Sequence, residues 1–455
     1  MNNLKENWLV LCVLVLALYM RLQLMTRSLF YDELYVAVHG VQAHSLYEAL
    51  FKEFSSSNHL GYTALAYITC HVLGTSELPL RLPALLFGLG SIYILWQWSQ
   101  KYFGKAIAIL GALLLALAPA HIIWSASARG YSACVFFTIL STALYFSLLE
   151  KPCLTTLIML VLTISVAPSF HVYFLCIIVV QLFHYLSIPD KAKTKIFVFT
   201  SIGAEMLLSL LLYYPLLADL GRMAVDHRDL VANFPLTLFN DLLSVPFWPL
   251  GSFCLILMVI GFIQPSNKLP RWRIYMALLF LMVLPLWLMK PVYLYPRFFA
   301  YLLPFMLLLL ANGAVSVVNI SPDRMKPFIK VLIAAVIGMI IWTWLTKPSK
   351  IMEDFHYKFR ESVQFAESAA GSQTKFCAFG NEDDFFQFYS DRPVRTFKTF
   401  DEFRRFYDQE NQIICFCMNG PPMPEEHKKI FLFTLSLPQA KAKNFDNIIV
   451  FDLKD

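Results

Sequence analysis

Residues 8–34 read WLVLCVLVLALYMRLQLMTRSLFYDEL: a long apolar run, a short polar break, and then aromatic residues around the acidic pair Asp32 and Glu33. A helix needs roughly 20 apolar residues to cross a hydrocarbon layer of about 30 Å, and the run from Trp8 to Met25 is close to that length. It is too long for the core of a signal peptide, and no small-residue cleavage site follows it. We therefore expect a retained membrane anchor with the acidic pair just beyond its end.

The composition extends this expectation to most of the chain. Of 455 residues, 58 % are hydrophobic and only 15 % are charged, which is more apolar surface than one soluble core could bury. The sequence predicts a mostly α, polytopic membrane protein with about 11 transmembrane helices, at 8–26, 82–100, 106–123, 131–149, 153–168, 170–188, 196–214, 248–264, 273–289, 297–318 and 328–346. The net charge of +6 does not imply a nucleic-acid partner, because in a membrane protein the placement of Lys and Arg matters more than their sum.

Basic residues fall in alternate gaps between these spans, and loops rich in Lys and Arg stay on the cytoplasmic side of a membrane. The gaps that carry them are 101–105, 191–195, 268–273 and 324–330. The N-terminus is then cytoplasmic, and the segments 27–81, 124–130, 215–247, 290–296 and everything after 347 lie outside. The segment Tyr62–Gly74 is apolar but only about 13 residues long, so we expect it to form a helix along the interface.

The chain divides at about residue 347. Residues 1–347 form the predicted membrane module, with a first outer loop at 27–81, and residues 348–455 form a small extracytoplasmic α/β domain. In this domain we expect an amphipathic stretch at 359–369, helices at 383–389 and 400–407, and strands at 375–379, 413–418, 431–435 and 447–453. Cys415 and Cys417 lack the second half of a zinc-binding spacing, which favours strand packing over a metal site.

Asp32 and Glu33 are the first candidates for chemistry. Ionisable groups beside membrane spans are costly, so those that persist are candidate functional groups. Adjacent carboxylates repel each other, which can raise the pKa of one of them and prepare it as a general base. The alternative is that the pair simply begins an interfacial helix, because acidic residues favour the first turn.

Other polar groups are expected on the same outer face, and their convergence with the acidic pair predicts a site. The candidates for substrate binding are His59, Arg81, Arg129, Tyr131, His171 and Arg297. Arg129 and Arg297 suit an anionic headgroup, because a guanidinium binds phosphate as a fork. Their alternative role is snorkelling to lipid phosphates at a helix end. His59 and His171 are weaker candidates, because a lone His at a helix end is more often a structural hydrogen-bonding residue. We predict no metal ligand among the candidates.

These residues also occur in a recognisable order. The chain reads Asp32-Glu33, His59-Leu60-Gly61-Tyr62, Ser76-Glu77 before Leu80-Arg81-Leu82-Pro83, Tyr102-Phe103-Gly104, and Ser125-Ala126-Ser127-Ala128-Arg129-Gly130-Tyr131. Over about residues 10–310, this order resembles GT-C membrane glycosyltransferases. The most similar members are the bacterial relatives of protein O-mannosyltransferases and of the lipid A aminoarabinose transferase.

The resemblance implies transfer of a sugar from a polyprenyl-phosphate donor to a glycan, lipid or protein acceptor on the outer side of the membrane. It implies that Asp32 is the essential acid and acts as the base, that Glu33 positions the acceptor or tunes Asp32, and that Arg129 and Arg297 hold the phosphate. It also implies juxtamembrane helices at Tyr35–Leu50 and Tyr62–Gly74, and inversion at the anomeric carbon. The predicted outer segments contain no Asn-X-Ser/Thr acceptor site, which agrees with a setting among the lipids of a bacterial inner membrane. No cofactor follows with certainty, and a divalent metal is left open.

Two departures from the family pattern matter. Relatives commonly read Ser-Gln-Glu-Ala-Arg where this chain has Ser127 in place of the Glu, and His-Pro-Pro where it has His59-Leu60-Gly61. Because this acid is missing, one alternative is a catalytically idle relative that acts in cell-envelope assembly through its C-terminal domain. The other alternative is a transporter or flippase of lipid-linked glycan, which should place ionisable groups near the bilayer midplane. In this chain most ionisable groups gather at one face instead, and Glu205 is the exception.

Overall fold

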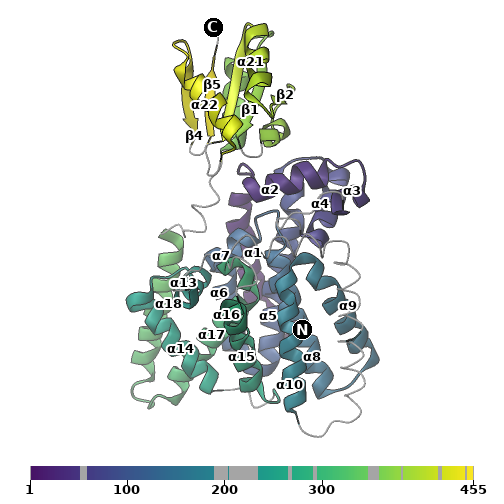
Figure 1. Cartoon of the computed structure of the whole chain (residues 1–455). Helices are drawn as coiled ribbons and strands as arrows, with labels where there is room; N and C mark the ends of the chain where they lie inside the picture. The colour runs from purple at the N-terminus through teal and green to yellow at the C-terminus, as the bar shows by residue number, and fades with distance from the viewer. Residues whose placement is uncertain are drawn as a thin grey trace.

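A computed structural model describes residues 2–51, 59–188, 203, 234–264, 269–289, 295–346, 358–380, 383–418, 423–445 and 448–453. The chain forms a helical module and a small C-terminal domain with a β-sheet, and in Figure 1 that domain lies above α2, α3 and α4 at one end of the helical module. Apart from residue 203, the predicted span 196–214 falls outside the described residues, as do Glu205 within it and most of the predicted outer loop 215–247.

The first part of the helical module builds the framework for the candidate site. Its elements are α1 (Asn2–Met25), α2 (Tyr31–Tyr35), the π-helical turn η1 (Val36–Val41), α3 (Leu46–Phe51), α4 (Leu60–Leu73), α5 (Glu77–Phe103), α6 (Lys105–Leu117), α7 (Pro119–Trp124), α8 (Tyr131–Glu150), α9 (Leu154–Phe170), the 3-10 turn η2 (Val172–Phe174) and α10 (Leu175–Ser187). The second part contains α13 (Phe234–Leu243), η4 (Phe247–Gly251), α14 (Ser252–Ile263), α15 (Trp272–Leu281), α16 (Val283–Met289), η5 (Pro296–Leu302), α17 (Leu303–Ile320) and α18 (Lys326–Thr346).

The chain is a multi-pass membrane protein. Within the described residues, five helices are long and apolar enough to cross a membrane, or up to six if a bent pair forms one span, and further apolar helices are 10–17 residues long. The count of about 11 spans stays a prediction. The predicted span 106–123 is wrong as a single helix, because α6 ends at Leu117 and α7 begins at Pro119, whose missing N–H interrupts a helix.

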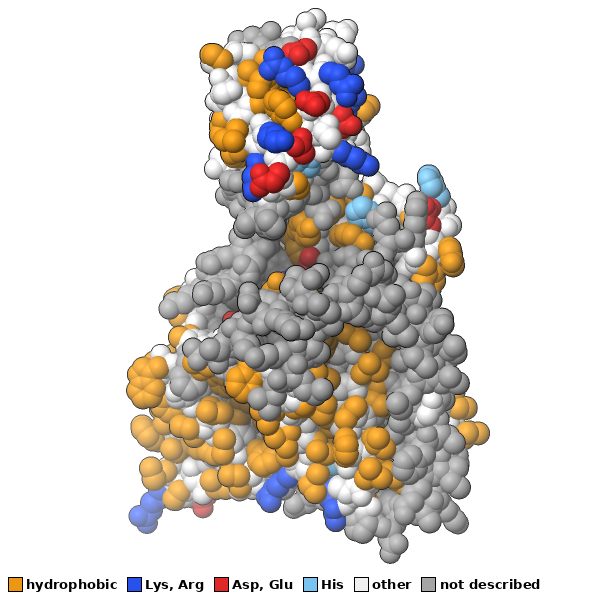
Figure 2. Space-filling model, viewed as in Figure 1, with side chains coloured by type: hydrophobic (Ala, Val, Ile, Leu, Met, Phe, Trp, Pro, Cys, Tyr) orange, Lys and Arg blue, Asp and Glu red, His pale blue; other side chains and the backbone are white. Residues whose placement is uncertain are grey.

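The surface of the helical module agrees with a membrane setting. Hydrophobic side chains cover its lower part in Figure 2, and Lys and Arg side chains lie along the lower edge, at the end opposite the C-terminal domain. Charged side chains of both signs cover the visible face of the C-terminal domain instead. An apolar band with basic residues beyond it is the pattern expected of a bundle that sits in lipid.

The C-terminal domain is a five-stranded sheet with the order β2-β1-β3-β5-β4. Its elements are α20 (Phe359–Ala369), β1 (Lys375–Gly380), the 3-10 turn η6 (Asp383–Phe388), β2 (Val394–Thr396), α21 (Phe400–Gln409), β3 (Ile413–Met418), α22 (Glu425–Ser436), β4 (Lys441–Phe445) and β5 (Ile448–Asp452). Strand β1 pairs in parallel with β2 and β3, whereas β5 runs antiparallel to β3 and β4. Cys377 and Cys415 are register partners on β1 and β3 and form a disulfide.

One predicted strand is wrong. The run 431–435 lies inside helix α22, which has Glu425 and Glu426 in its first turn and buries His427, Ile430 and Thr434. These three buried positions are spaced three and four residues apart, which is the spacing of one helix face. The apolar run was therefore only the C-terminal part of an amphipathic helix.

The C-terminal domain packs directly on the segment that follows α1. The Leu29 amide donates to the Tyr389 hydroxyl at 2.8 Å, and the Arg360 guanidinium donates to the Glu77 carboxylate at 2.9 Å. The rings of Tyr31 and Phe385 meet edge to face with centroids 5.4 Å apart. The segment that follows α1 is thus held between the helical module and the C-terminal domain.

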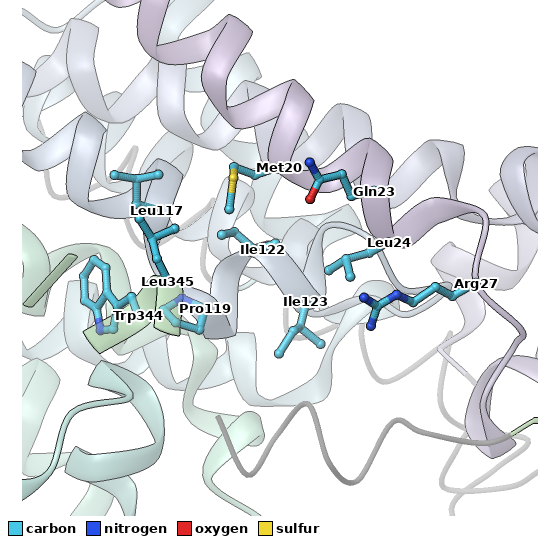
Figure 3. Close-up of a pocket in the computed structure, with 10 residues that line it drawn as sticks. All are labelled: Met20, Gln23, Leu24, Arg27, Leu117, Pro119, Ile122, Ile123, Trp344 and Leu345. Carbon is cyan, nitrogen blue, oxygen red and sulfur yellow. The ribbon is translucent and has the colours of Figure 1, made fainter. Parts of the chain in front are cut away.

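A cavity of about 270 Å³ lies between α1, α7 and α18 (Figure 3). Leu24, Ile122, Ile123 and Trp344 supply apolar parts of its lining, and Gln23 and Arg27 supply the polar ones. The side chains of the candidate site do not line it.

Candidate active site

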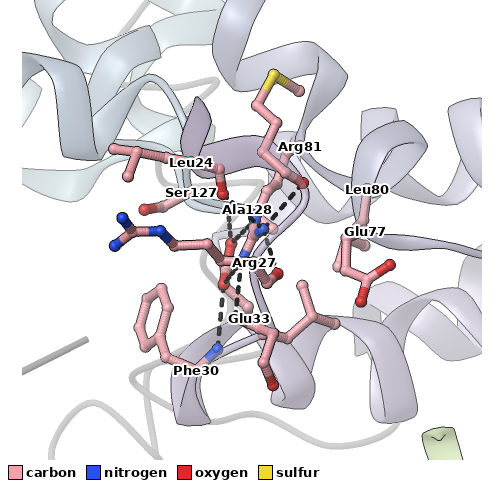
Figure 4. Close-up of polar contacts among 12 residues, drawn as sticks. Leu24, Arg27, Phe30, Glu33, Glu77, Leu80, Arg81, Ser127 and Ala128 are labelled. Atoms are coloured by element: carbon pink, nitrogen blue, oxygen red, sulfur yellow. Dashed lines mark hydrogen bonds and ion pairs between the residues drawn. The ribbon is translucent and has the colours of Figure 1, made fainter. Parts of the chain in front are cut away.

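Glu33 and Arg81 form a fully paired ion pair inside the protein. Arg81 Nε donates to Glu33 Oε1 at 2.7 Å, and Arg81 Nη2 donates to Glu33 Oε2 at 2.5 Å (Figure 4). The Ala128 amide donates to Glu33 Oε1 at 2.6 Å, and the Phe30 amide donates to Oε2 at 3.2 Å. Both side chains are buried. Because each carboxylate oxygen already accepts two hydrogen bonds, Glu33 is held as a structural group.

Arg81 also closes the end of α1. Its Nη1 donates to the carbonyl oxygens of Met25 and Arg27, at 3.0 and 2.7 Å, and its Nη2 donates to the carbonyl of Ser28 at 3.2 Å. The last carbonyls of a helix have no partner within the helix, and a guanidinium satisfies them well. The Glu33–Arg81 pair therefore fixes the path of the chain from α1 into α2.

Asp32 lies in a different environment from its neighbour. Its Oδ2 is 3.8 Å from Arg129 Nη2 and 3.7 Å from Arg297 Nη2, both beyond hydrogen-bond distance. The Asp32 side chain is 15 % exposed and that of Arg297 27 %, whereas that of Arg129 is 3 % exposed. We call these three residues the Asp32 cluster. It brings together one carboxylate and two guanidinium groups from segments far apart in the sequence, with access from solvent.

His59, Tyr131 and His171 form an aromatic group beside Arg129. Their ring centroids lie 5.2 to 5.3 Å apart, and the guanidinium carbon of Arg129 is 5.7 Å from the centre of the Tyr131 ring. His59 Nδ1 donates to the Phe170 carbonyl at 2.5 Å. Burial and the nearby Arg129 hold the pKa of His59 well below its usual value. The Tyr131 hydroxyl is buried and has no hydrogen-bond partner among the described residues.

Gly130 lets two segments approach each other at this point. A Cβ at residue 130 would lie 2.0 Å from the Phe170 carbonyl oxygen and 2.6 Å from His59 Nδ1, which is closer than real Cβ atoms come. Any side chain here would push apart the segment that carries Arg129 and the segment that carries His171. The glycine thus places the aromatic group against the cluster arginine.

Arg21 is a positioning residue that the sequence alone did not single out. It is fully buried in α1, and it donates to Ser125 Oγ at 2.7 Å, to the Ala116 carbonyl at 3.0 Å and to His121 Nδ1 at 2.8 Å. This network joins the first span to the ends of α6 and α7, just before Arg129. The available signal was a single Arg near the end of an otherwise apolar run.

The cation-binding capacity of the site is limited. Among the residues that the structure describes, no three His, Cys, Asp or Glu side chains come together as a metal site would need. Ser127 does not supply an acidic group, and its hydroxyl donates to the Ile123 carbonyl at 2.7 Å. Because guanidinium groups face Asp32, the cluster suits an anion better than a metal ion.

Residues 60–218 match the family model described as dolichyl-phosphate-mannose-protein mannosyltransferase. The fold is similar to that of ArnT from Cupriavidus metallidurans in the apo state, with a TM-score of 0.63 and 12 % identity over 98 % of each chain. The same protein bound to undecaprenyl phosphate gives a TM-score of 0.62 and 12 % identity, over 98 % of this chain and 97 % of that one.

An archaeal protein is also similar. The oligosaccharyltransferase AglB from Archaeoglobus fulgidus, in complex with an inhibitory peptide and a dolichol-phosphate, gives a TM-score of 0.55 and 10 % identity over 90 % of this chain and 69 % of that chain. No curated protein matches the chain in sequence. The expected resemblance to GT-C membrane glycosyltransferases is confirmed.

Proposed function

We propose that the protein is a membrane glycosyltransferase that moves a sugar from a polyprenyl-phosphate donor to an acceptor. The observation that carries the proposal is the Asp32 cluster, in which a partly exposed carboxylate faces two guanidinium groups at 3.7 and 3.8 Å. The similarity to ArnT with undecaprenyl phosphate and to AglB with a dolichol-phosphate supports a lipid-phosphate donor. The acceptor is a glycan, lipid or protein that reaches the same face.

The cluster offers the two functions that this transfer needs. A hydroxyl is a weak nucleophile until a base accepts its proton, and Asp32 is the carboxylate placed to accept it. As the acceptor oxygen bonds to the anomeric carbon, the bond from that carbon to the phosphate oxygen breaks and leaves negative charge on the phosphate. Arg129 and Arg297 stabilise that charge. A single displacement of this kind inverts the anomeric configuration.

The remaining predicted site residues receive roles that differ from one another. Glu33 and Arg81 are positioning residues, because their hydrogen-bonding groups are already used to hold the segment that bears Asp32. Tyr131 is the best further donor to the substrate, since its buried hydroxyl has no partner among the described residues. Neutral His59 and His171 form the wall beside it. We derive no step through a metal ion.

We infer that the C-terminal domain and the site lie on the extracytoplasmic side. The Cys377–Cys415 disulfide supports this orientation, because disulfides persist in oxidising compartments and are rare in the cytosol. The basic gaps of the sequence support it independently, and a bacterial inner membrane fits both. Alkylation of intact cells before and after reduction tests it: the two cysteines should become reactive only after reduction, and reactive thiols without reduction would contradict the orientation.

Transfer itself is tested with purified protein in lipid nanodiscs, supplied with polyprenyl-phospho-sugars and an extract of candidate acceptors. Wild type should release free polyprenyl phosphate, and Asp32→Asn should release it about 10²- to 10⁴-fold more slowly, the range typical of general-base catalysis. Asp323→Asn, an exposed acid that pairs with Lys326 at the start of α18, is the matched control and should behave as wild type. Equal release by wild type and Asp32→Asn would refute the catalytic role.

The same assay separates the two rivals. A transporter would move lipid-linked glycan between leaflets without releasing lipid phosphate, and an idle relative would do neither. Among the described residues, the buried Arg21 already has hydrogen bonds to Ser125, Ala116 and His121, which gives it a structural explanation without a transport role.

A further inference from the structure

The cavity between α1, α7 and α18 is built to take an elongated apolar ligand. It is about 270 Å³, close to the lower end of the roughly 300–1,000 Å³ typical of ligand pockets, so it suits one hydrocarbon chain better than a bulky ring system. Leu24, Ile123 and Leu345 contribute to its apolar lining (Figure 3). Leu345 is 55 % exposed, so the cavity opens at the surface of the helical module.

The cavity lies near the end of the membrane-crossing region. Two of its walls come from α1 and α18, which are both candidate spans. Arg27 is two residues beyond the last residue of α1, and Trp344 is two residues before the last residue of α18. Both helix ends therefore place the cavity at the depth where lipid chains give way to headgroups, and Trp and Arg are side chains typical of that depth.

The walls are fixed by the protein itself. Trp344 Nε1 donates to the Leu243 carbonyl at 2.6 Å, which orients the indole ring on one side. Pro119 lies at the first position of α7, where its ring sets the direction of the short helix on another side. A cavity with fixed walls needs little rearrangement to bind a ligand, which lowers the entropic cost of binding.

The polar end of the cavity carries positive charge. Arg27 is exposed, and its guanidinium has no hydrogen bond or ion pair with the residues that the structure describes. Gln23, four residues earlier, lines the same cavity and offers an amide donor. A cation and a neutral donor at the headgroup end, above an apolar chain site, are complementary to a lipid phosphate.

We propose that this cavity binds an anionic phospholipid of the surrounding bilayer, with one acyl chain between α1, α7 and α18 and the phosphate on Arg27. The site is separate from the proposed donor site, because Asp32, Arg129 and Arg297 do not line it. It also touches the same chain segment, since the Arg27 carbonyl accepts a hydrogen bond from Arg81 at 2.7 Å. The bound lipid supports the turn that leads from α1 to Asp32.

Photolabelling tests the site directly. Full-length protein in nanodiscs is irradiated with phosphatidylglycerol or phosphatidylcholine that carries the same diazirine acyl chain, and the labelled peptides are identified. We expect labels within 20–27, 117–123 and 344–345, with phosphatidylglycerol about fivefold above phosphatidylcholine, the preference that one interfacial cation gives. Arg27→Gln should remove the preference, and Leu345→Trp should block labelling of all three segments.

The controls make the result decisive. Arg324→Gln, an exposed Arg before α18 at the opposite end of that helix, should keep the fivefold preference. Equal labelling by the two lipids in wild type would overturn the proposal, as would labels spread evenly over outward residues such as Leu162 and Val259. Loss of the label when undecaprenyl phosphate is added in equal amount would also overturn it, because the cavity would then hold the donor. Labelling needs no catalysis, so Asp32→Asn should be labelled like wild type even if the proposed transfer is wrong.

Discussion

The Glu33–Arg81 pair and the Asp32 cluster contain adjacent carboxylates that the fold treats in opposite ways. Glu33 is buried, accepts four hydrogen bonds and meets its arginine at 2.5 and 2.7 Å. Asp32 is partly exposed and lies 3.7 and 3.8 Å from its two arginines. The first pair is closed off inside the protein, and the second leaves its carboxylate within reach of a substrate. The difference teaches that access from the surface, more than charge or position in the sequence, separates a structural acid from a candidate catalytic one.

The largest effect on stability should come from breaking the Glu33–Arg81 pair. Arg81→Leu leaves Glu33 buried without its cation, which we expect to cost about 3–5 kcal/mol of unfolding free energy. The double variant Glu33→Gln with Arg81→Leu should recover part of this loss, because no buried charge remains. Denaturant unfolding in detergent measures both. Lys101→Gln, which breaks an exposed ion pair with Glu150, is the control and should cost no more than about 1 kcal/mol.

The Asp32 cluster should respond in binding and not in stability. Arg297→Gln removes a charged donor to the phosphate, a loss of roughly 1.5–3 kcal/mol, so we expect KM for the donor lipid to rise by about tenfold or more. Its unfolding free energy should stay within about 0.5 kcal/mol of wild type, because the side chain is partly exposed. Steady-state kinetics and unfolding on the same preparation decide the matter. A stability loss as large as that of Arg81→Leu would erase the distinction between the two regions.

His59, in the aromatic group beside the cluster, should make the unfolding free energy depend on pH. The pKa of His59 is lowered in the folded protein by burial and by Arg129, so the unfolded chain binds a proton near pH 6.5 that the folded protein does not. His59 therefore has no effect on the pH dependence above about pH 6.5, and below that value it makes the unfolding free energy fall as the pH falls, with a slope of about 1.4 kcal/mol per pH unit. His59→Gln should reduce the slope of unfolding free energy against pH by about that amount between pH 6 and 5. An unchanged slope would mean that the pKa of His59 is the same in the folded and the unfolded protein.

The smallest expected effect concerns the contact between the two domains. Tyr389→Phe removes the hydroxyl that accepts the Leu29 amide, which should cost about 1 kcal/mol, close to the mean for one hydrogen bond. Hydrogen exchange at the Leu29 amide should become faster, while exchange at Ala128, held by Glu33, should stay slow. Faster exchange at both amides would show that the two regions are not independent.

The sequence predicted the helices and strands better than the contacts between residues distant in the chain. Helix α20 and strand β3 have the predicted bounds, because periodicity and alternation are local properties of the chain. The helix over 431–435 was missed, because a short apolar run does not by itself distinguish a helix from a strand. The break at Pro119 was missed because the apolar run 106–123 continues across it. The family resemblance assigned the base to Asp32, but the residues alone could not distinguish it from Glu33. That distinction depends on Arg81 and the Ala128 amide, which are distant in the chain.

The hydrogen bond between Leu29 and Tyr389 spans 360 positions of the sequence. During synthesis the segment that bears Asp32 is made 360 residues before the tyrosine that fixes it. Domains tend to fold in the order in which they emerge, so this segment waits for the C-terminal domain before it has its final neighbours. A chain terminated before residue 389 would carry the candidate catalytic acid without this contact, which ties the assembly of the site to synthesis of the C-terminal domain.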